Sequence, residues 1–111
     1  MTANLDAAFG LRGQPADVVA RAVSTALGMT LRQRDSSYIG LYWSADADGR
    51  HVQVTDATDP DGEYFLDELF GFDVAVRLYG PFPRTVPDDV SAALPAARML
   101  LCEWTEESPR G

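Results

Sequence analysis

Apolar residues recur along the chain with two different spacings, which predict helices and strands. Valine and alanine residues at helical spacing predict a helix over residues 15–27, where Pro15 suits the first turn and Gly28 follows the end. A second, shorter helix is predicted over residues 87–94, because a proline and two acidic residues occupy its first turn. Each helix has one apolar stripe, so both are expected to cover a sheet.

Alternation of polar and apolar residues predicts the strands. The strongest, residues 38–44, is rich in aromatic and branched side chains, and a turn at Asp48-Gly49 leads to a returning strand over residues 51–55. Residues 64–70 fit either a helical turn or an extended segment. Further strands are predicted over residues 29–34, 72–79 and 98–104.

The two ends of the chain have weaker patterns. Residues 1–13 lack clear periodicity, so we expect a loose lead-in in which Phe9 or Leu11 touches the core. Residues 105–111 are polar and are expected to fray.

These elements predict a single α+β domain over residues 1–111, large enough for one core. Strands joined by tight turns are antiparallel neighbours, so we expect a mostly antiparallel sheet of four to five strands with both helices packed on one face. The final strand, helix and strand should form a right-handed crossover if the two strands are parallel. The predicted core residues are Val19, Val23, Leu27, Ile39, Leu41, Trp43, Val52, Val54, Val74, Val76, Leu78, Val90, Leu94 and Leu101.

Net charge narrows the set of partners. The chain of 111 residues carries a formal net charge of −8. Such a surface repels phosphate backbones and anionic lipids, so we expect no nucleic acid and no membrane as partner, but a basic protein. The sequence contains neither an apolar run of roughly 18 residues nor a basic leader before an apolar segment, which predicts a cytoplasmic protein.

Residue usage narrows the chemistry. All 9 basic residues are arginine and alanine is abundant, a bias that is typical of GC-rich coding sequences and predicts a bacterial source such as an actinobacterium. Without lysine, no Schiff base can form on this chain. The sole cysteine, Cys102, has leucine and tryptophan neighbours and is predicted to be buried. The sole histidine, His51, begins a strand and is predicted to be exposed.

No nucleophile, base and orienting residue stand at a recognisable spacing, so we expect a protein that is not an enzyme and binds no cofactor. Ser36, Ser37 and Ser44 could meet His51, but no Gly-x-Ser-x-Gly elbow is present. The acidic residues always offer carboxylate pairs, although nothing singles one pair out. One cysteine and one histidine cannot form a structural zinc site without several carboxylates.

Acidic side chains gather in one stretch, residues 56–68, which also contains turn residues at positions 59–62. Calcium-loop spacing around Gly49 and around Gly62 fails at an essential ligand position in each case. A weak, irregular cation site within residues 56–63 stays open beside the simpler interpretation of a solvated acidic turn.

Tyrosines on one strand face complete the candidate site. Tyr38, Tyr42 and Tyr79 alternate out of the apolar face, where they either bind a protein or pack at a sheet edge. The two acidic turns, residues 45–49 and 56–63, lie at opposite ends of the strand between them. The candidate partner-binding residues are therefore Asp46, Asp48, Asp56, Asp59, Asp61, Glu63, Tyr38, Tyr42 and Tyr79.

A resemblance adds to this interpretation. It rests on two segments, RDSSYIGLY at residues 34–42 and DPDGE at residues 59–63, on the hairpin between them and on the strand, helix and strand that follow. In this pattern the chain is similar to small uncharacterised bacterial proteins. Some of those proteins resemble the immunity proteins of toxin systems. The resemblance covers residues 31–104 and implies an interaction protein without catalytic residues.

The sequence therefore predicts a non-catalytic module that binds, and neutralises or regulates, a basic protein through both acidic turns. The alternative is a small-molecule-binding or hydrolytic domain that uses the tyrosine-bearing sheet face. A deep pocket with a carboxylate beside His51 or Arg77 would favour the alternative, whereas a convex surface would favour the module.

Overall fold

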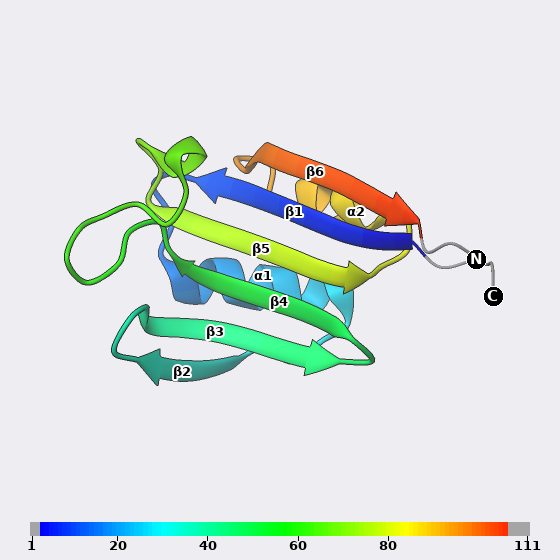
Figure 1. Ribbon diagram of the computed structural model, residues 1–111, viewed down its shortest axis with the longest axis horizontal. Helices are drawn as coiled ribbons and strands as arrows, with labels where there is room; N and C mark the ends of the chain where they lie inside the picture. The colour runs from blue at the N-terminus through cyan, green and yellow to red at the C-terminus, as the bar shows by residue number, and fades with distance from the viewer. Residues whose placement is uncertain (1–2, 107–111) are drawn as a thin grey trace.

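The computed structural model describes residues 3–106 and contains one open antiparallel sheet, with both helices on the same face (Figure 1). The strands are β1 (Ala3–Leu11), β2 (Arg32–Ser36), β3 (Gly40–Ala47), β4 (Arg50–Asp56), β5 (Val74–Pro81) and β6 (Arg98–Glu106). The helices are α1 (Ala16–Leu27) and α2 (Val86–Ala93), and a 3-10 turn spans Asp67–Leu69. The predicted α+β class is confirmed, but the sheet has six strands rather than four to five.

The strands lie in the order β2-β3-β4-β5-β1-β6, which follows from the path of the chain. β5 and β6 both pair antiparallel with β1, so they are parallel to each other and α2 crosses between them. The strands β4-β5-β1-β6, together with α1 and α2, have the order and connections of the ferredoxin-like split βαβ motif. The β2–β3 hairpin extends this motif beyond β4.

The prediction of a loose lead-in over residues 1–13 is wrong for residues 3–11, because they form β1, which occupies a central position between β5 and β6. Leu5 and Phe9 point toward the helices and are fully buried. The other side of β1 carries Ala8 and Gly10, which are buried as well. A strand that is buried on both sides shows little polar alternation, so its sequence pattern is weak.

β6 forms one edge of the sheet and continues through Glu106. The fraying expected of residues 105–111 lies, from position 107 on, outside the described residues. Cys102 is exposed on this strand, so the prediction of a buried thiol is wrong. The reason is its place in the fold, since an edge strand has a neighbouring strand on one side only.

The core lies between the sheet and the two helices. The predicted core residues that are confirmed as buried are Val19, Val23, Val52, Val54, Val74, Val76, Leu78, Val90 and Leu94. Leu27 and Trp43 are partly buried and pack against this cluster. Within residues 3–106, no helix has the length and apolar character that crossing a bilayer requires.

The other predicted core residues lie outside this cluster. Leu41 is 56% exposed, because it lies at the turn end of the β2–β3 hairpin, where it pairs with Asp35 of the edge strand β2 and precedes the pairing of β3 with β4. Ile39 precedes β3 in the hairpin turn and is only partly buried. Leu101 is also partly exposed, because it lies opposite Ala8 on the side of β6 that faces away from the helices.

Gly80 determines how closely β5 approaches the turn between β3 and β4. Its φ is 124°, and an added Cβ would lie 2.9 Å from the Cα of Arg50 and nearer still to the carbonyl oxygen of Gly49. Beside it, the Nε of Arg50 donates a hydrogen bond of 2.6 Å to the carbonyl oxygen of Pro81. The turn therefore packs backbone against backbone, and this contact requires a residue without a side chain.

Replacing Gly80 with alanine is expected to lower the free energy of unfolding by about 2–4 kcal/mol, because steric overlap adds to backbone strain. Gly62→Ala is the matched control, since Gly62 has a φ of 89° but an added Cβ meets no atom within 4 Å. Strain alone should cost this control about 1 kcal/mol. Urea denaturation followed by circular dichroism measures both, and equal losses would contradict close backbone packing at Gly80.

Candidate functional site

The sheet face opposite the helices, which we call the open face, is largely polar. Strand register places on it Asp6, Tyr42, Ser44, His51, Gln53, Thr55, Arg77 and Tyr79. The chain between β4 and β5, residues 57–73, lies over one end of this face (Figure 1). We call this segment the acidic loop.

Asp59 organises the tip of the acidic loop. Its Oδ1 accepts hydrogen bonds of 2.9 Å from the backbone N–H groups of Asp61 and Glu63. Thr58 and Tyr64 pair as an antiparallel bridge, and the N–H of Asp59 donates to the carbonyl oxygen of Glu63 at 2.8 Å. The tip is thus a closed hairpin. Among the described residues, no three His, Cys, Asp or Glu side chains are grouped so that they could hold a metal ion.

The base of the acidic loop is tied to the end of β1. The N–H of Asp73 donates to the carbonyl oxygen of Leu11 at 2.8 Å, and the carbonyl oxygen of Asp73 accepts from the N–H of Ala57 at 2.8 Å. Arg12 Nε donates to the carbonyl oxygen of Gly71 at 2.6 Å. Both ends of the loop are therefore fixed to the same region of the sheet.

Phe72 anchors the loop on the open face. Its ring lies directly on Gly10 of β1, where an added Cβ would approach the ring to 2.7 Å. The guanidinium carbon of Arg12 lies 4.4 Å from the ring centroid. Together with Leu69 and Ala75, Phe72 belongs to a small hydrophobic cluster that is separate from the main core. The loop is therefore held by packing as well as by hydrogen bonds.

Three aromatic side chains of the same loop are exposed. Phe70 is 77% exposed, Phe65 38% and Tyr64 36%. The ring centroids of Tyr64 and Phe70 are 5.4 Å apart, and the hydroxyl of Tyr64 accepts a hydrogen bond of 3.2 Å from the N–H of Gly71. Large apolar side chains that are exposed together mark contact surfaces, because they gain stability when a partner covers them.

A second segment adjoins the loop at this end of the sheet. Tyr38, which is 84% exposed, lies in the turn between β2 and β3. The turn meets the loop where Gly40 faces Pro60, since an added Cβ on Gly40 would lie 3.5 Å from the Cγ of Pro60. We call the exposed residues gathered here the aromatic–acidic end, which comprises Tyr38, Tyr64, Phe65, Phe70, Asp56, Asp61, Glu63, Asp67 and Glu68.

The structure divides the predicted site residues between the two ends of β4, which are about 20 Å apart for its seven residues. Asp46 and Asp48 lie at the far end, where the Oδ1 of Asp46 is 2.7 Å from the Nδ1 of His51. Tyr79 pairs with His51 across β4 and β5. Tyr42 lies opposite Thr55, on the open face near the end of β4 that leads into the acidic loop, and is partly buried.

The predicted acidic residues of the near end do not share one role. Asp56, Asp61 and Glu63 are exposed, whereas the carboxylate of Asp59 holds the loop together. Sequence reasoning missed Phe65 and Phe70 as site residues. Their position beside the acidic residues is the signal that could have found them, but the pattern of residues 64–70 could not say which aromatic rings face outward.

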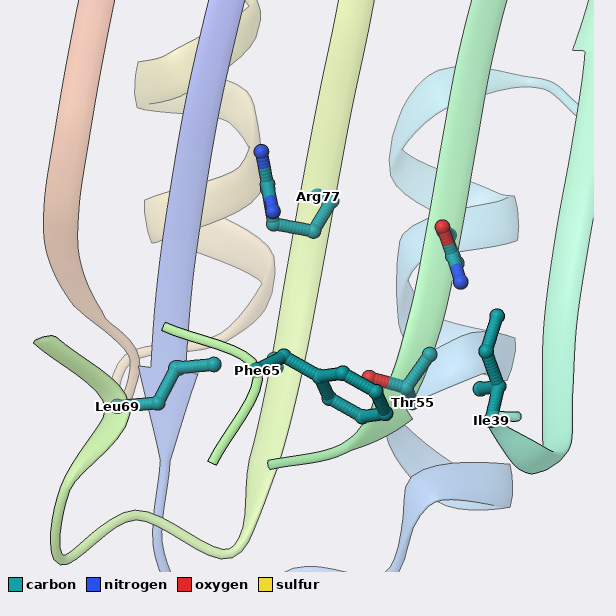
Figure 2. Close-up of a pocket in the computed structure, with 7 residues that line it drawn as sticks. Ile39, Thr55, Phe65, Leu69 and Arg77 are labelled. Carbon is teal, nitrogen blue, oxygen red and sulfur yellow. The ribbon is translucent and has the colours of Figure 1, made fainter. Parts of the chain in front are cut away.

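A cavity of about 130 Å³ lies on the open face under the edge of the acidic loop (Figure 2). Its apolar walls are Ile39, Phe65, Leu69 and Ala75, and its polar walls are Gln53, Thr55 and Arg77. The carboxylate nearest to Arg77 is that of Asp6, whose Oδ1 is 3.6 Å from Nη2, but Asp6 does not line the cavity. His51 does not line it either.

The chain matches no protein-family model, and no curated protein matches it. The aromatic–acidic end and the open face are therefore the features of this protein that bear on its function.

Replacing Gly10 with alanine is expected to displace Phe72 and release the acidic loop. Amide hydrogen exchange at Ala57, Glu63 and Asp73 should accelerate, because these N–H groups form the hydrogen bonds that hold the loop. Amides in the middle of β4 should stay protected. Gly28→Ala, at the end of α1, is the control: it has a φ of 64° and free space for a Cβ. Slow exchange at the three loop amides in Gly10→Ala would show that Phe72 is not the anchor.

Proposed function

We propose that this protein is a non-catalytic interaction module that binds, and thereby neutralises or regulates, a basic protein through its aromatic–acidic end. The exposure of Phe70, at 77% on a loop tied down at its tip and its base, carries the proposal. An exposed aromatic ring on a fixed support suits the centre of a protein interface.

Pre-organisation supports this role. Immobilising a flexible loop on binding would consume part of the binding free energy. Here the hydrogen bonds of Asp59 and Asp73 and the packing of Phe72 already order the loop. A partner that covers Phe65 and Phe70 therefore gains contact area without first ordering the segment that presents them.

Charge supports a basic partner. The net charge of −8 disfavours nucleic acid and anionic membranes as partners. We propose that the interaction takes place in the cytoplasm. Acidic residues at the rim of an interface mainly accelerate association and select the partner, while covered aromatic residues slow dissociation. Asp56, Asp61 and Glu63 are exposed, which suits such a rim position.

We propose that the second acidic turn, with Asp46 and Asp48, contacts the same partner at the other end of the sheet. It lies about 20 Å from the aromatic–acidic end, so only a partner that spans the open face can reach both. Such a partner would pass over Tyr42 and Tyr79. The resemblance to immunity proteins suggests a toxin with a basic surface, and a basic protein encoded by a neighbouring gene is the first to test.

Neutralising the rim is expected to slow association with that partner. Asp56→Asn, Asp61→Asn and Glu63→Gln together should lower the association rate constant by about tenfold in low salt. The difference should shrink as salt rises, because exposed charges are screened beyond about 8 Å at physiological ionic strength. Asp59 is left in place because it holds the loop.

The matched control neutralises three acidic residues on the helices, with the changes Asp17→Asn, Asp88→Asn and Asp89→Asn. Both triple variants have the same net charge, so only the position of the lost charge differs. Stopped-flow mixing at several salt concentrations measures the rates. If association slows equally in the two variants, the acidic residues near the loop act only through the net charge of the protein and not through their position.

Replacing Phe70 with alanine is expected to weaken binding by about thirtyfold, mainly through faster dissociation. The free energy of unfolding should hardly change, because the side chain is 77% exposed. Val18→Ala on α1, where Val18 is 44% exposed, is the control for loss of an exposed apolar side chain. Surface plasmon resonance measures the association and dissociation rates. An unchanged dissociation rate for Phe70→Ala would show that the aromatic–acidic end is not part of the interface.

A further inference from the structure

We propose that the cavity under the acidic loop receives one apolar side chain of a bound polypeptide, and that a backbone carbonyl next to this side chain accepts a hydrogen bond from Arg77. The identity of the occupant rests on the proposed function, because a protein partner supplies the side chain. The cavity itself can be tested without that partner.

The size and the walls of the cavity select the side chain. A closed apolar cavity of about 150 Å³ holds a molecule as large as benzene, so about 130 Å³ suits the smaller side chain of leucine or isoleucine. The sheet contributes Thr55 and Ala75, which are almost completely buried. Phe65 and Ile39 are partly exposed at the opening, so an entering side chain meets apolar surface first.

Arg77 supplies the polar recognition. Its Nε is buried, and no described residue offers that atom a hydrogen-bond acceptor. The contact between Nη2 and Asp6 is 3.6 Å long and leaves the Nε donor free. A buried donor without a partner is costly, so a shift of this partly exposed side chain that brings Nε to an acceptor of a ligand is favoured.

Local charge favours a neutral carbonyl over a free carboxylate. Asp6 already offsets the charge of Arg77, and Glu103 lies directly opposite Asp6 across β1 and β6. A second carboxylate at Arg77 would therefore face the charge of Asp6 on the adjacent strand β1 and, one strand further, that of Glu103 on β6. A peptide carbonyl satisfies the Nε donor without this repulsion, which indicates the interior of a chain and not its C-terminal carboxylate.

The probe is N-acetyl-leucinamide, which has one apolar side chain, two carbonyl groups and no charge. Titration into the ¹⁵N-labelled protein should give saturable shifts of the amides of Gln53, Thr55, Phe65 and Arg77. N-acetyl-alaninamide should bind at least about tenfold more weakly, because it lacks three carbon atoms that the cavity would bury. N-acetyl-leucine, with its free carboxylate, should bind no more tightly than the amide. Shifts that do not saturate, or equal affinity for the alanine compound, would overturn the proposal.

Two variants locate the site. Gln53→Phe places a ring into the cavity from a partly exposed position of β4 and should abolish binding of the probe, whereas Asn4→Phe, on the open face of β1 away from the cavity, should not. Arg77→Met keeps an unbranched apolar side chain but removes the donor, so the probe should bind about fivefold more weakly. Full affinity in Gln53→Phe would exclude this cavity, and full affinity in Arg77→Met would exclude the role of Arg77.

The same variants separate this proposal from the proposed function. If the probe binds here but no basic protein binds the aromatic–acidic end, the cavity stands and the proposed function fails. If a basic partner binds the wild-type protein and Gln53→Phe with equal affinity, the interface stands and the cavity is excluded as its anchor point.

Discussion

The position of β1 between β5 and β6 is the constraint on which the rest of the structure depends. This first strand of the chain lies between β5 and β6, which are far from it in the sequence, and joins them into one sheet; it also buries Leu5 and Phe9 under the helices. Its last residues also hold the acidic loop. The carbonyl oxygen of Leu11 accepts a hydrogen bond from the N–H of Asp73, and the ring of Phe72 packs on Gly10. The core and the candidate site therefore share one support.

The acidic loop shows how a short segment can present apolar side chains without unfolding. Leu69 and Phe72 are buried against the sheet, while Phe65 and Phe70 are exposed within the same stretch. The buried pair provides the packing that a loop of this length otherwise lacks, and the carboxylate of Asp59 replaces part of the hydrogen bonding of a longer hairpin. The exposed rings are thus presented by an ordered backbone.

The sheet has two free edges, and both carry features that disfavour pairing with another sheet. β2 is short and contains Arg32, Arg34 and Asp35, and the register of β6 shifts opposite Ala8 and Phe9 of β1. Charged side chains and irregular register are common protections of edge strands. Pairing of either edge strand with another sheet is therefore disfavoured.

The sequence by itself determined the elements whose patterns are local. The valine stripe of α1, the alternation in β4 and β5 and the turn at Asp48-Gly49 predicted their structures, because neighbouring residues decide these choices. The acidic character of the loop was equally visible. Only the tertiary structure decided the place of β1, the outward position of Phe70 and the cavity at Arg77. Each of these depends on surface that distant segments cover or leave open, and no local pattern records such long-range packing.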